Sequence, residues 1–189
     1  MELKNKTILF LGSSVTYGSA SGGVSFVDMI GELCGAACVK EAVSGTTLVD
    51  LNESSYIARL KAVAAGLRPD LFVCQLSTND ATRRLDIRDI EAAIRFIVDY
   101  VQQTFGCPIV FYTGTYYEST EYLRMVERLY ELQKTHGFYI LDLYNDEQMR
   151  AVSEADYRRY MADAVHPTLL GYREWWTPKF VDFLGALTV

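Results

Sequence analysis

Five short apolar runs recur along the chain, and most of the gaps between them are long enough for a helix. The runs cover residues 7–11, 38–43, 71–76, 109–113 and 138–143. Each run is nearly continuous in apolar character, which is typical of strands that are covered on both faces of a parallel sheet. This feature constrains the fold more than any other, because it favours strands that alternate with covering helices.

Several of the intervening segments have the residue pattern of helices. They cover residues 54–67, 87–105 and 118–136. Glycines that suit helix C-caps stand near their ends: Gly66, Gly106 and Gly137. A last helix is expected over residues 169–187, with a kink or a break at Pro178. This order predicts an α/β fold, a three-layer α/β/α sandwich around a five-stranded parallel sheet.

Length and composition narrow the class of protein further. A chain of 189 residues without internal repeat or linker predicts one domain over residues 1–189. An apolar share of 50% and a mean hydropathy of +0.05 exclude a disordered or fibrous chain. The 18 Lys and Arg against 24 Asp and Glu give a net charge of −6, and no segment concentrates the basic residues. Nucleic acid and membrane surfaces are therefore excluded as predicted partners.

The cysteines and the amino-terminal residues bear on the compartment. Four scattered cysteines are too few for a disulfide framework: Cys34, Cys38, Cys74 and Cys107. Three of them lie in apolar stretches, where a reduced, buried thiol is usual. Cys34 and Cys38 without a second pair are a weak zinc pattern, so no metal is predicted. The first apolar run is too short for a signal peptide, and no run reaches the ~20 residues of a membrane span, so we expect a cytoplasmic protein.

Small and polar residues follow each predicted strand at the point where it ends. They include Ser14, Gly45, Asn79, Tyr116 and, past the fifth strand, the pair Asp163 and His166. In an open parallel sheet, ligands bind outside the carboxyl ends of the strands. We therefore expect a functional site at this edge.

The chain has only two histidines, and histidine is the natural general base near neutral pH. His136 lies at the end of a predicted helix, where a cation that caps the helix dipole is the simpler interpretation. His166 follows Asp163 by three residues, a spacing at which the carboxylate folds back onto the imidazole Nδ1. A turn with an Asp cap and a partly exposed histidine is the alternative.

Ser14 is the candidate nucleophile, because a serine at a strand-to-helix turn exposes both its hydroxyl and its own N–H. The alternative is that Ser13 or Ser14 only caps the next helix. A phosphate-binding loop does not fit, because the segment lacks the glycine spacing and the lysine of such loops. Gly45 could offer a backbone N–H and Asn79 a side-chain N–H to an oxyanion, although both are also common turn residues.

The candidate residues occur in the order and spacing of a known family: Ser14, Gly45, Asn79 and His166. The chain resembles the SGNH hydrolases, also called the GDSL esterase/lipase family. The resemblance extends from residue 12 to Pro167, and the last block, which begins at Asp163, is its most specific part. The following Gly171 and Tyr172 are similar to the family's usual continuation.

This resemblance implies a flavodoxin-like sheet and a role for each matching residue. Ser14 would be the nucleophile, His166 the base and Asp163 the carboxylate that orients the base. The N–H groups of Ser14 and Gly45 and the side chain of Asn79 would form the oxyanion hole. No metal or organic cofactor is implied.

Two positions depart from the family's usual pattern. Ser13 stands where the first block has aspartate, which alters the expected support of the nucleophile loop. Ser77 stands where the third block has glycine, and a side chain there is expected to crowd the Asn79 turn or to narrow the acyl pocket. Neither change removes a group that takes part in the chemistry.

The sequence therefore predicts a serine esterase that forms an acyl-enzyme on small carboxylic esters, with acetyl or other short acyl groups, including those on carbohydrates. Candidate substrate contacts are Ser13, Ser77, Tyr116 and Tyr117. For the tyrosines, packing of helices and loops is the alternative. Other functions stay open: a lysophospholipase or thioesterase of the same family, a catalytically silent ligand-binding module, and a flavin or nucleotide binder. A dimer also stays open, because exposed aromatic residues suit an interface.

Overall fold

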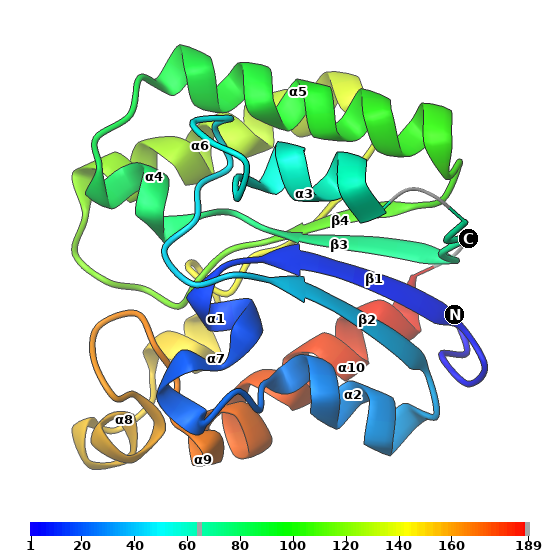
Figure 1. Ribbon diagram of the computed structural model, residues 1–189. Coiled ribbons are helices and arrows are strands. Elements are labelled where there is room, and N and C mark those ends of the chain that lie inside the picture. The colour runs from blue at the N-terminus through cyan, green and yellow to red at the C-terminus, as the bar shows by residue number, and fades with distance from the viewer. Residues whose placement is uncertain (64–65, 188–189) are drawn as a thin grey trace.

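One parallel sheet of five strands lies at the centre of the computed structural model, which describes residues 1–63 and 66–187 (Figure 1). The strands are β1 (Thr7–Gly12), β2 (Ala37–Ala42), β3 (Leu71–Gln75), β4 (Ile109–Tyr112) and β5 (Tyr139–Leu141). Their order in the sheet is β2-β1-β3-β4-β5, and every neighbouring pair is parallel. This is the flavodoxin-like order, so the predicted fold is confirmed.

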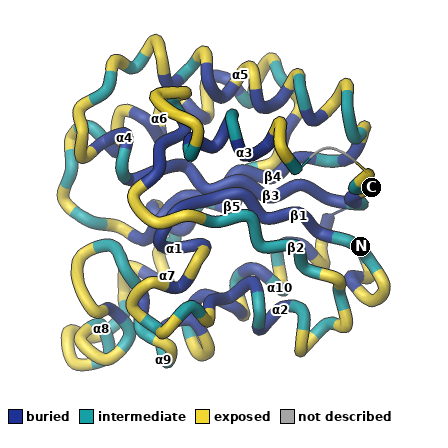
Figure 2. Tube along the Cα trace, viewed as in Figure 1, coloured by how far each residue is buried: buried dark blue, intermediate teal, exposed yellow. Residues whose placement is uncertain are grey.

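Burial divides the strands into a central group and two edges (Figure 2). Strands β1, β3 and β4 are buried almost throughout, as their continuous apolar runs predict. The prediction of full cover is wrong for β2 and β5, which lie at the edges and stay partly exposed. Lys40 and Glu41 in β2 are the polar residues that an edge strand tolerates.

Helices cover both faces of the sheet (Figure 1). On one face lie α3 (Tyr56–Val63), α5 (Ile87–Thr104) and α6 (Thr120–His136). On the other face lie α2 (Phe26–Cys34) and α10 (Thr177–Ala186). The apolar stripe predicted for the long helix α5 is buried: Ile90, Ala93, Ile94, Ile97, Val98 and Val101.

The helices differ from their predicted bounds in informative ways. Within the described residues α3 is shorter than the predicted 54–67, of which residues 64–65 lie outside the description. Helix α2 was not predicted, although Ser25 and Asp28 form a capping box at its start. The predicted last helix is not split: its backbone stays helical while the hydrogen bonding changes from α9 (Leu169–Gly171) through a π-helical turn (Tyr172–Trp176), just before Pro178, to α10.

Short elements gather at the carboxyl edge of the sheet. They are α1 (Ser14–Tyr17), the 3₁₀ turn at Ser19–Ser21, α4 (Thr78–Thr82), α7 (Glu147–Arg150) and α8 (Glu154–Tyr160). Each has fewer than eight residues, too short for a clear helical period in the sequence. Ser14 begins α1 and Asn79 lies in α4, whereas the other candidate residues lie in the loops of this edge.

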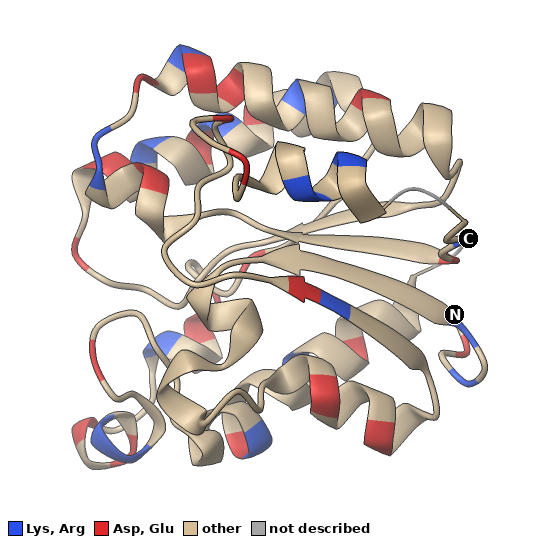
Figure 3. Cartoon of the chain, viewed as in Figure 1, with Lys and Arg blue, Asp and Glu red and all other residues tan. Residues whose placement is uncertain are grey.

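The charges, the apolar helices and the possible metal ligands of the described residues bear on the predicted partners and cofactors. In the view of Figure 3, acidic and basic residues are both spread over the helices. Among the residues that the structure describes, no helix combines the length and apolar character of a membrane span. The same residues contain no group of three or more His, Cys, Asp or Glu side chains arranged for a metal ion. The cytoplasmic location and the exclusion of nucleic acid stay predictions.

The cysteines and His136 lie in structural positions. All four cysteines are free thiols, and burial raises the pKa of Cys38 to about 12. His136 ends α6, with its Nδ1 3.0 Å from the Leu132 carbonyl oxygen. Gly137 caps this helix in the left-handed conformation, as predicted.

Candidate active site

A chain of hydrogen bonds joins Ser14, His166 and Asp163 at the carboxyl edge of the sheet. The Ser14 Oγ lies 2.8 Å from the His166 Nε2. On the other side of the ring, the His166 Nδ1 lies 2.8 Å from Asp163 Oδ2 and 3.0 Å from Oδ1. A hydroxyl, an imidazole and a carboxylate in this order allow the imidazole to take the hydroxyl proton.

A short turn holds His166 against Asp163. The Asp163 Oδ1 accepts hydrogen bonds from the backbone N–H groups of Val165 and His166, both at 2.8 Å. The N–H of Ala162 donates to the His166 carbonyl at 2.9 Å and closes the turn. Local backbone bonds thus orient the carboxylate and the ring together.

Asp163 keeps its negative charge in this setting. Burial raises its pKa, but the N–H groups of Val165 and His166 and the His166 ring lower it further, so that the pKa lies below its ordinary value. The Asp163 side chain is 57% exposed, so solvent screens its charge and the hydrogen bonds carry most of the interaction.

Gln75, at the end of β3, supports the segment that carries Ser14. The Gln75 Oε1 accepts hydrogen bonds from the Ser13 N–H at 2.9 Å and from the Thr16 hydroxyl at 2.8 Å. Ser13 is the N-cap residue of α1, but its side chain makes no capping hydrogen bond. Gln75 therefore supports the loop in which Ser13 replaces the family's usual aspartate.

The buried side chain of Arg59 connects the first two loops of the site. Its Nη2 donates to the Gly12 carbonyl at 2.8 Å and to the Thr46 hydroxyl at 3.1 Å. Its Nη1 donates to the carbonyl of Glu41 at 2.8 Å and to the Glu41 Oε1 at 3.2 Å, and its Nε to the Ser54 carbonyl at 2.9 Å. One guanidinium thus fixes the loops after β1 and β2 relative to each other.

Two further donors lie on the loop after β2 and in α4, the short helix that follows β3. Gly45 has a φ of 78°, a left-handed conformation that favours glycine, and no atom lies within 4 Å of the place of a Cβ. The Asn79 Nδ2 donates one hydrogen bond to the Thr46 carbonyl at 2.9 Å. A primary amide carries two N–H groups, so the second stays available to a substrate oxygen.

The neighbours of Asn79 hold it in position. The Ser77 Oγ caps α4 by accepting the Asn79 N–H at 3.2 Å. The sequence predicted that this side chain crowds the turn or narrows the acyl pocket, and it did not predict the cap. The Asp80 carboxylate accepts the N–H groups of Leu48 at 2.9 Å and Val49 at 3.1 Å. Burial raises the pKa of Asp80 above its ordinary value. These bonds tie α4 to the loop after β2.

Gly171 and Tyr172 anchor the segment that follows His166. A Cβ on Gly171 would stand 2.0 Å from the Tyr160 carbonyl oxygen, so only glycine fits this close backbone contact. The Tyr172 hydroxyl donates to the Val15 carbonyl at 2.7 Å. The segment is thereby held against α1, next to the candidate nucleophile.

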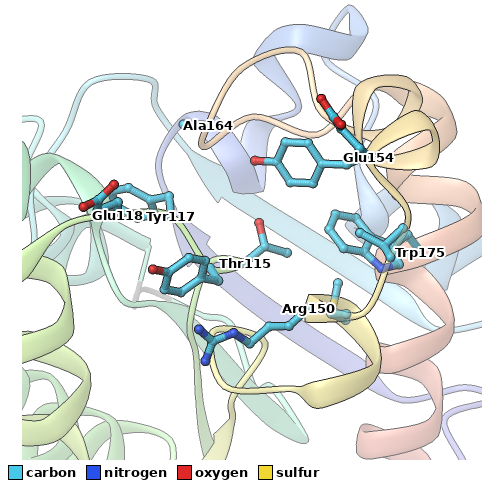
Figure 4. A pocket seen from close by; sticks show the side chains of 11 residues that line it. Thr115, Tyr117, Glu118, Arg150, Glu154, Ala164 and Trp175 are labelled. Atoms are coloured by element: carbon cyan, nitrogen blue, oxygen red, sulfur yellow. The ribbon is translucent and has the colours of Figure 1, made fainter.

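A pocket of about 570 Å³ opens beside the turn that carries His166. Tyr116 and Tyr117 line it from the segment after β4, and Ala164 lines it from the turn itself (Figure 4). Two of the predicted substrate contacts therefore face this pocket. The other two, Ser13 and Ser77, have fully buried side chains, which favours support of the loops over contact with a substrate.

The sequence analysis missed Gln75 and Arg59. Gln75 ends an apolar run, and Arg59 lies among the buried residues Tyr56, Ile57 and Leu60 of α3. A polar residue on an otherwise apolar face was the available signal, because such groups are rarely buried without partners.

Comparison with solved structures identifies proteins of similar fold. A member of the lipolytic G-D-S-L family from Veillonella parvula has 16% identity and a TM-score of 0.74, over 96% of this chain and 99% of that chain. A candidate SGNH hydrolase from Slackia heliotrinireducens has 24% identity and a TM-score of 0.73, over 96% and 100%. An active-site mutant of a family two carbohydrate esterase from Clostridium thermocellum has 15% identity and a TM-score of 0.69, over 96% and 65%.

Comparison of the sequence itself decides the family. No protein with a curated function matches the chain significantly. The family of GDSL-like lipases and acylhydrolases, however, matches residues 10–174, which include every residue of the hydrogen-bonded chain described above. The protein therefore belongs to the GDSL-like lipase/acylhydrolase family, the SGNH hydrolases.

Proposed function

We propose that the protein is a serine esterase that hydrolyses small carboxylic esters with short acyl groups, acetyl above all. The observation that carries the proposal is the pair of contacts on His166, 2.8 Å to the Ser14 hydroxyl and 2.8 Å to the Asp163 carboxylate. A base that is placed between a hydroxyl and an orienting carboxylate activates the hydroxyl as a nucleophile.

In the first step, the Ser14 Oγ forms a bond to the acyl carbon while its proton passes to the His166 Nε2. The oxyanion then collapses, the bond from the acyl carbon to the alcohol oxygen breaks, and His166 returns the proton to that oxygen. Asp163 keeps the ring oriented and stabilises the imidazolium. The products of this step are an acyl-serine and the free alcohol.

In the second step, His166 takes a proton from a water molecule, whose oxygen attacks the acyl carbon. The bond to the Ser14 oxygen breaks, and the proton on His166 passes to that oxygen. The carboxylic acid leaves, and the free Ser14 hydroxyl is restored.

The N–H groups of Ser14 and Gly45 and the second Asn79 N–H act as the donors to the oxyanion in both steps. Ser14 is the first residue of α1, so its N–H has no partner within the helix. The bonds that Arg59 and Asn79 make to Thr46 support a close approach of the three donors. Each such donor contributes roughly 3 kcal/mol to the stabilisation of the transition state.

A lysophospholipase or thioesterase is the alternative within the family. The pocket beside His166 is lined by the exposed charged residues Glu118, Arg150 and Glu154 and also by the apolar side chains of Met149, Val152 and Trp175. A series of esters of increasing acyl length decides between the two. A maximum of kcat/KM at about eight carbons or more would favour the alternative.

Labelling with a fluorophosphonate probe tests the proposal directly, because the reaction requires an activated serine. The wild type is expected to be labelled on Ser14 and to hydrolyse p-nitrophenyl acetate. Ser14→Ala is expected to lose the label and to lower kcat by roughly 10⁴-fold or more. The exposed Ser19 offers the control variant Ser19→Ala, which should keep both properties.

Two outcomes contradict the proposal. Turnover by Ser14→Ala at the wild-type rate would exclude Ser14 as the nucleophile. A folded wild type that neither binds the probe nor hydrolyses any ester of the series would instead identify a silent ligand-binding module.

A further inference from the structure

The pocket beside the His166 turn combines two kinds of side chain. Aromatic rings line it at Tyr116, Tyr157 and Trp175. Charged groups line it at Glu118, Arg150 and Glu154. Figure 4 shows Thr115, Arg150 and Trp175 around a common space. Its volume of about 570 Å³ is within the range of small-molecule sites.

Thr115 gives the pocket an unsatisfied hydrogen-bonding group. The residue is 4% exposed, and its Oγ1 has no hydrogen-bond partner. Buried hydroxyls in native proteins are nearly always hydrogen-bonded, so an exception calls for a missing partner. A hydroxyl or ether oxygen of a bound molecule would supply that partner.

Arg150 gives the pocket a charged donor in a fixed place. Its guanidinium lies over the Tyr116 ring, with the Cζ 4.2 Å from the ring centroid. Within the described residues, its side chain makes no ion pair, so its N–H groups are available to a ligand. Cation–π contact restrains the guanidinium without using these N–H groups.

This set of side chains fits a sugar better than it fits a lipid or an anion. Aromatic faces stack on the C–H faces of a sugar ring, and carboxylates, guanidinium and hydroxyl groups bond to its hydroxyls. An alkyl chain would leave the Thr115 hydroxyl without a hydrogen bond, and an anion would meet Glu118 and Glu154 as well as Arg150. Both alternatives are less favourable than a neutral polyol.

The position of the pocket relates it to one half of the ester. In the proposed reaction, the alcohol oxygen leaves by taking the proton from His166 Nε2, so the alcohol half has to lie on the histidine side. Ala164, in the turn that carries His166, forms part of the pocket wall. We propose that this pocket binds a sugar as the alcohol half of the ester, with Thr115 and Arg150 as the residues that select it; this inference rests on the proposed esterase function.

Two esters that share the acetyl group and differ in the alcohol test this proposal: a methyl glucoside acetylated at one hydroxyl only, with its other hydroxyls free, and ethyl acetate. For the wild type, kcat/KM should be higher for the sugar ester. In Arg150→Ala and in Thr115→Val, the ratio of kcat/KM for the sugar ester to that for ethyl acetate should fall about tenfold, mainly through KM, as expected for the loss of a hydrogen bond to substrate. Arg88→Ala, an exposed arginine on α5, should leave the ratio unchanged.

Thr115→Val carries a second readout. Because the hydroxyl has no partner in the protein, its replacement by a methyl group should not lower the thermal midpoint, although it lowers the ratio. A lower thermal midpoint with an unchanged ratio would show that the hydroxyl stabilises the fold, and would overturn its assignment as a contact to the sugar.

The remaining outcomes separate this inference from the proposed function. Equal kcat/KM for the two esters in the wild type, or variants that leave the ratio unchanged, would overturn the sugar site while the esterase stands. A change in acyl-length preference in Arg150→Ala, without a change in the ratio, would place the acyl half in the pocket and also overturn it. Failure of the esterase itself is detected separately, through the absence of Ser14 labelling.

Discussion

At the scale of single residues, the site depends on side chains that take no part in the chemistry. Ser14 and His166 are 152 residues apart in the chain and meet at 2.8 Å. Gln75 and Arg59 hold the loop of Ser14, and the Asp163 turn holds His166. A displacement of about 1 Å in such a site is enough to lower the rate strongly, so these supports are open to test.

Replacement of Arg59 by methionine tests whether the guanidinium that joins the loops after β1 and β2 is needed for the rate of the reaction. Arg59→Met removes one donor from each of the carbonyls of Gly12, Glu41 and Ser54, so the free energy of unfolding should fall by about 3 kcal/mol. The folded variant should show a larger loss in kcat than rise in KM, because the oxyanion donors lose alignment. Urea unfolding and steady-state kinetics measure the two effects.

Arg59→Lys is the matched variant for this experiment. Lysine keeps the charge but cannot bridge several acceptors with a planar fork, so it should recover only part of the loss. A kcat at the wild-type value in Arg59→Met would show that the loops keep their alignment without the guanidinium.

The lowered pKa of Asp163 predicts how stability depends on pH. Because the folded pKa lies below the unfolded value of about 3.9, the ionised carboxylate stabilises the fold above that pH. This contribution is lost as the pH falls through the folded pKa. Asp163→Asn should therefore be less stable than the wild type near pH 7, and the difference should shrink at about pH 3 and below. Parallel curves of unfolding free energy against pH for the two proteins would contradict this.

At the scale of elements, short segments with special ends place the site. Ser77 caps α4, a π-helical turn leads into α10, and Gly171 brings α9 close to the end of α8. Pro178 lies in the first turn of α10, directly after the π-helical turn. Because proline has no N–H, it cannot donate a hydrogen bond to the preceding turn, and the regular α-helical pattern is interrupted there.

Gly171→Ala should disturb the segment that follows His166. The new Cβ would stand 2.0 Å from the Tyr160 carbonyl oxygen, which also accepts the Thr168 N–H at 2.8 Å. We expect a loss of about 1–3 kcal/mol in unfolding free energy, as in other overpacked sites, and a lower kcat. In Gly185→Ala, no atom lies within 4 Å of the new Cβ, and α10 should gain about 0.5–1 kcal/mol. Equal stability of the two variants in thermal unfolding would exclude the close contact as the cause.

At the scale of the whole molecule, two hydrophobic cores lie on opposite faces of the sheet. One packs α3, α5 and α6 against the strands, and the other packs α2 and α10. Phe26 lies in the middle of the second core, with its ring centroid 4.0 Å from that of Phe180 and 5.4 Å from that of Tyr112. This core holds the carboxy-terminal elements that follow His166.

Phe26→Ala should destabilise the protein strongly, because the ring is fully buried and its removal leaves a cavity. The expected loss in unfolding free energy is about 3–5 kcal/mol. Leu33→Ala, on the same helix but 72% exposed, should change it by less than about 0.5 kcal/mol. Urea unfolding of both variants measures the contrast, and losses of similar size would contradict the assignment of this core.

The fold was predictable because the signals for its elements are local. Continuous apolar runs mark the strands, and the period of α5 marks its buried stripe. The predicted cover failed where the neighbours in the sheet decide the burial, as in β2 and β5. No helix was predicted where the element spans little more than one turn, as in α4 and α7.

The residues of the candidate site also fall into those set by local sequence and those set by contacts between distant segments. The pairing of Asp163 with His166 depends on a turn of four residues, so the amino-acid order determined it by itself. The parts played by Arg59, Gln75 and the pocket at Thr115 and Arg150 were decided only by the tertiary structure. Each joins loops from different strands, and the partner of a polar group is set by which chain segments become neighbours when the apolar faces are buried.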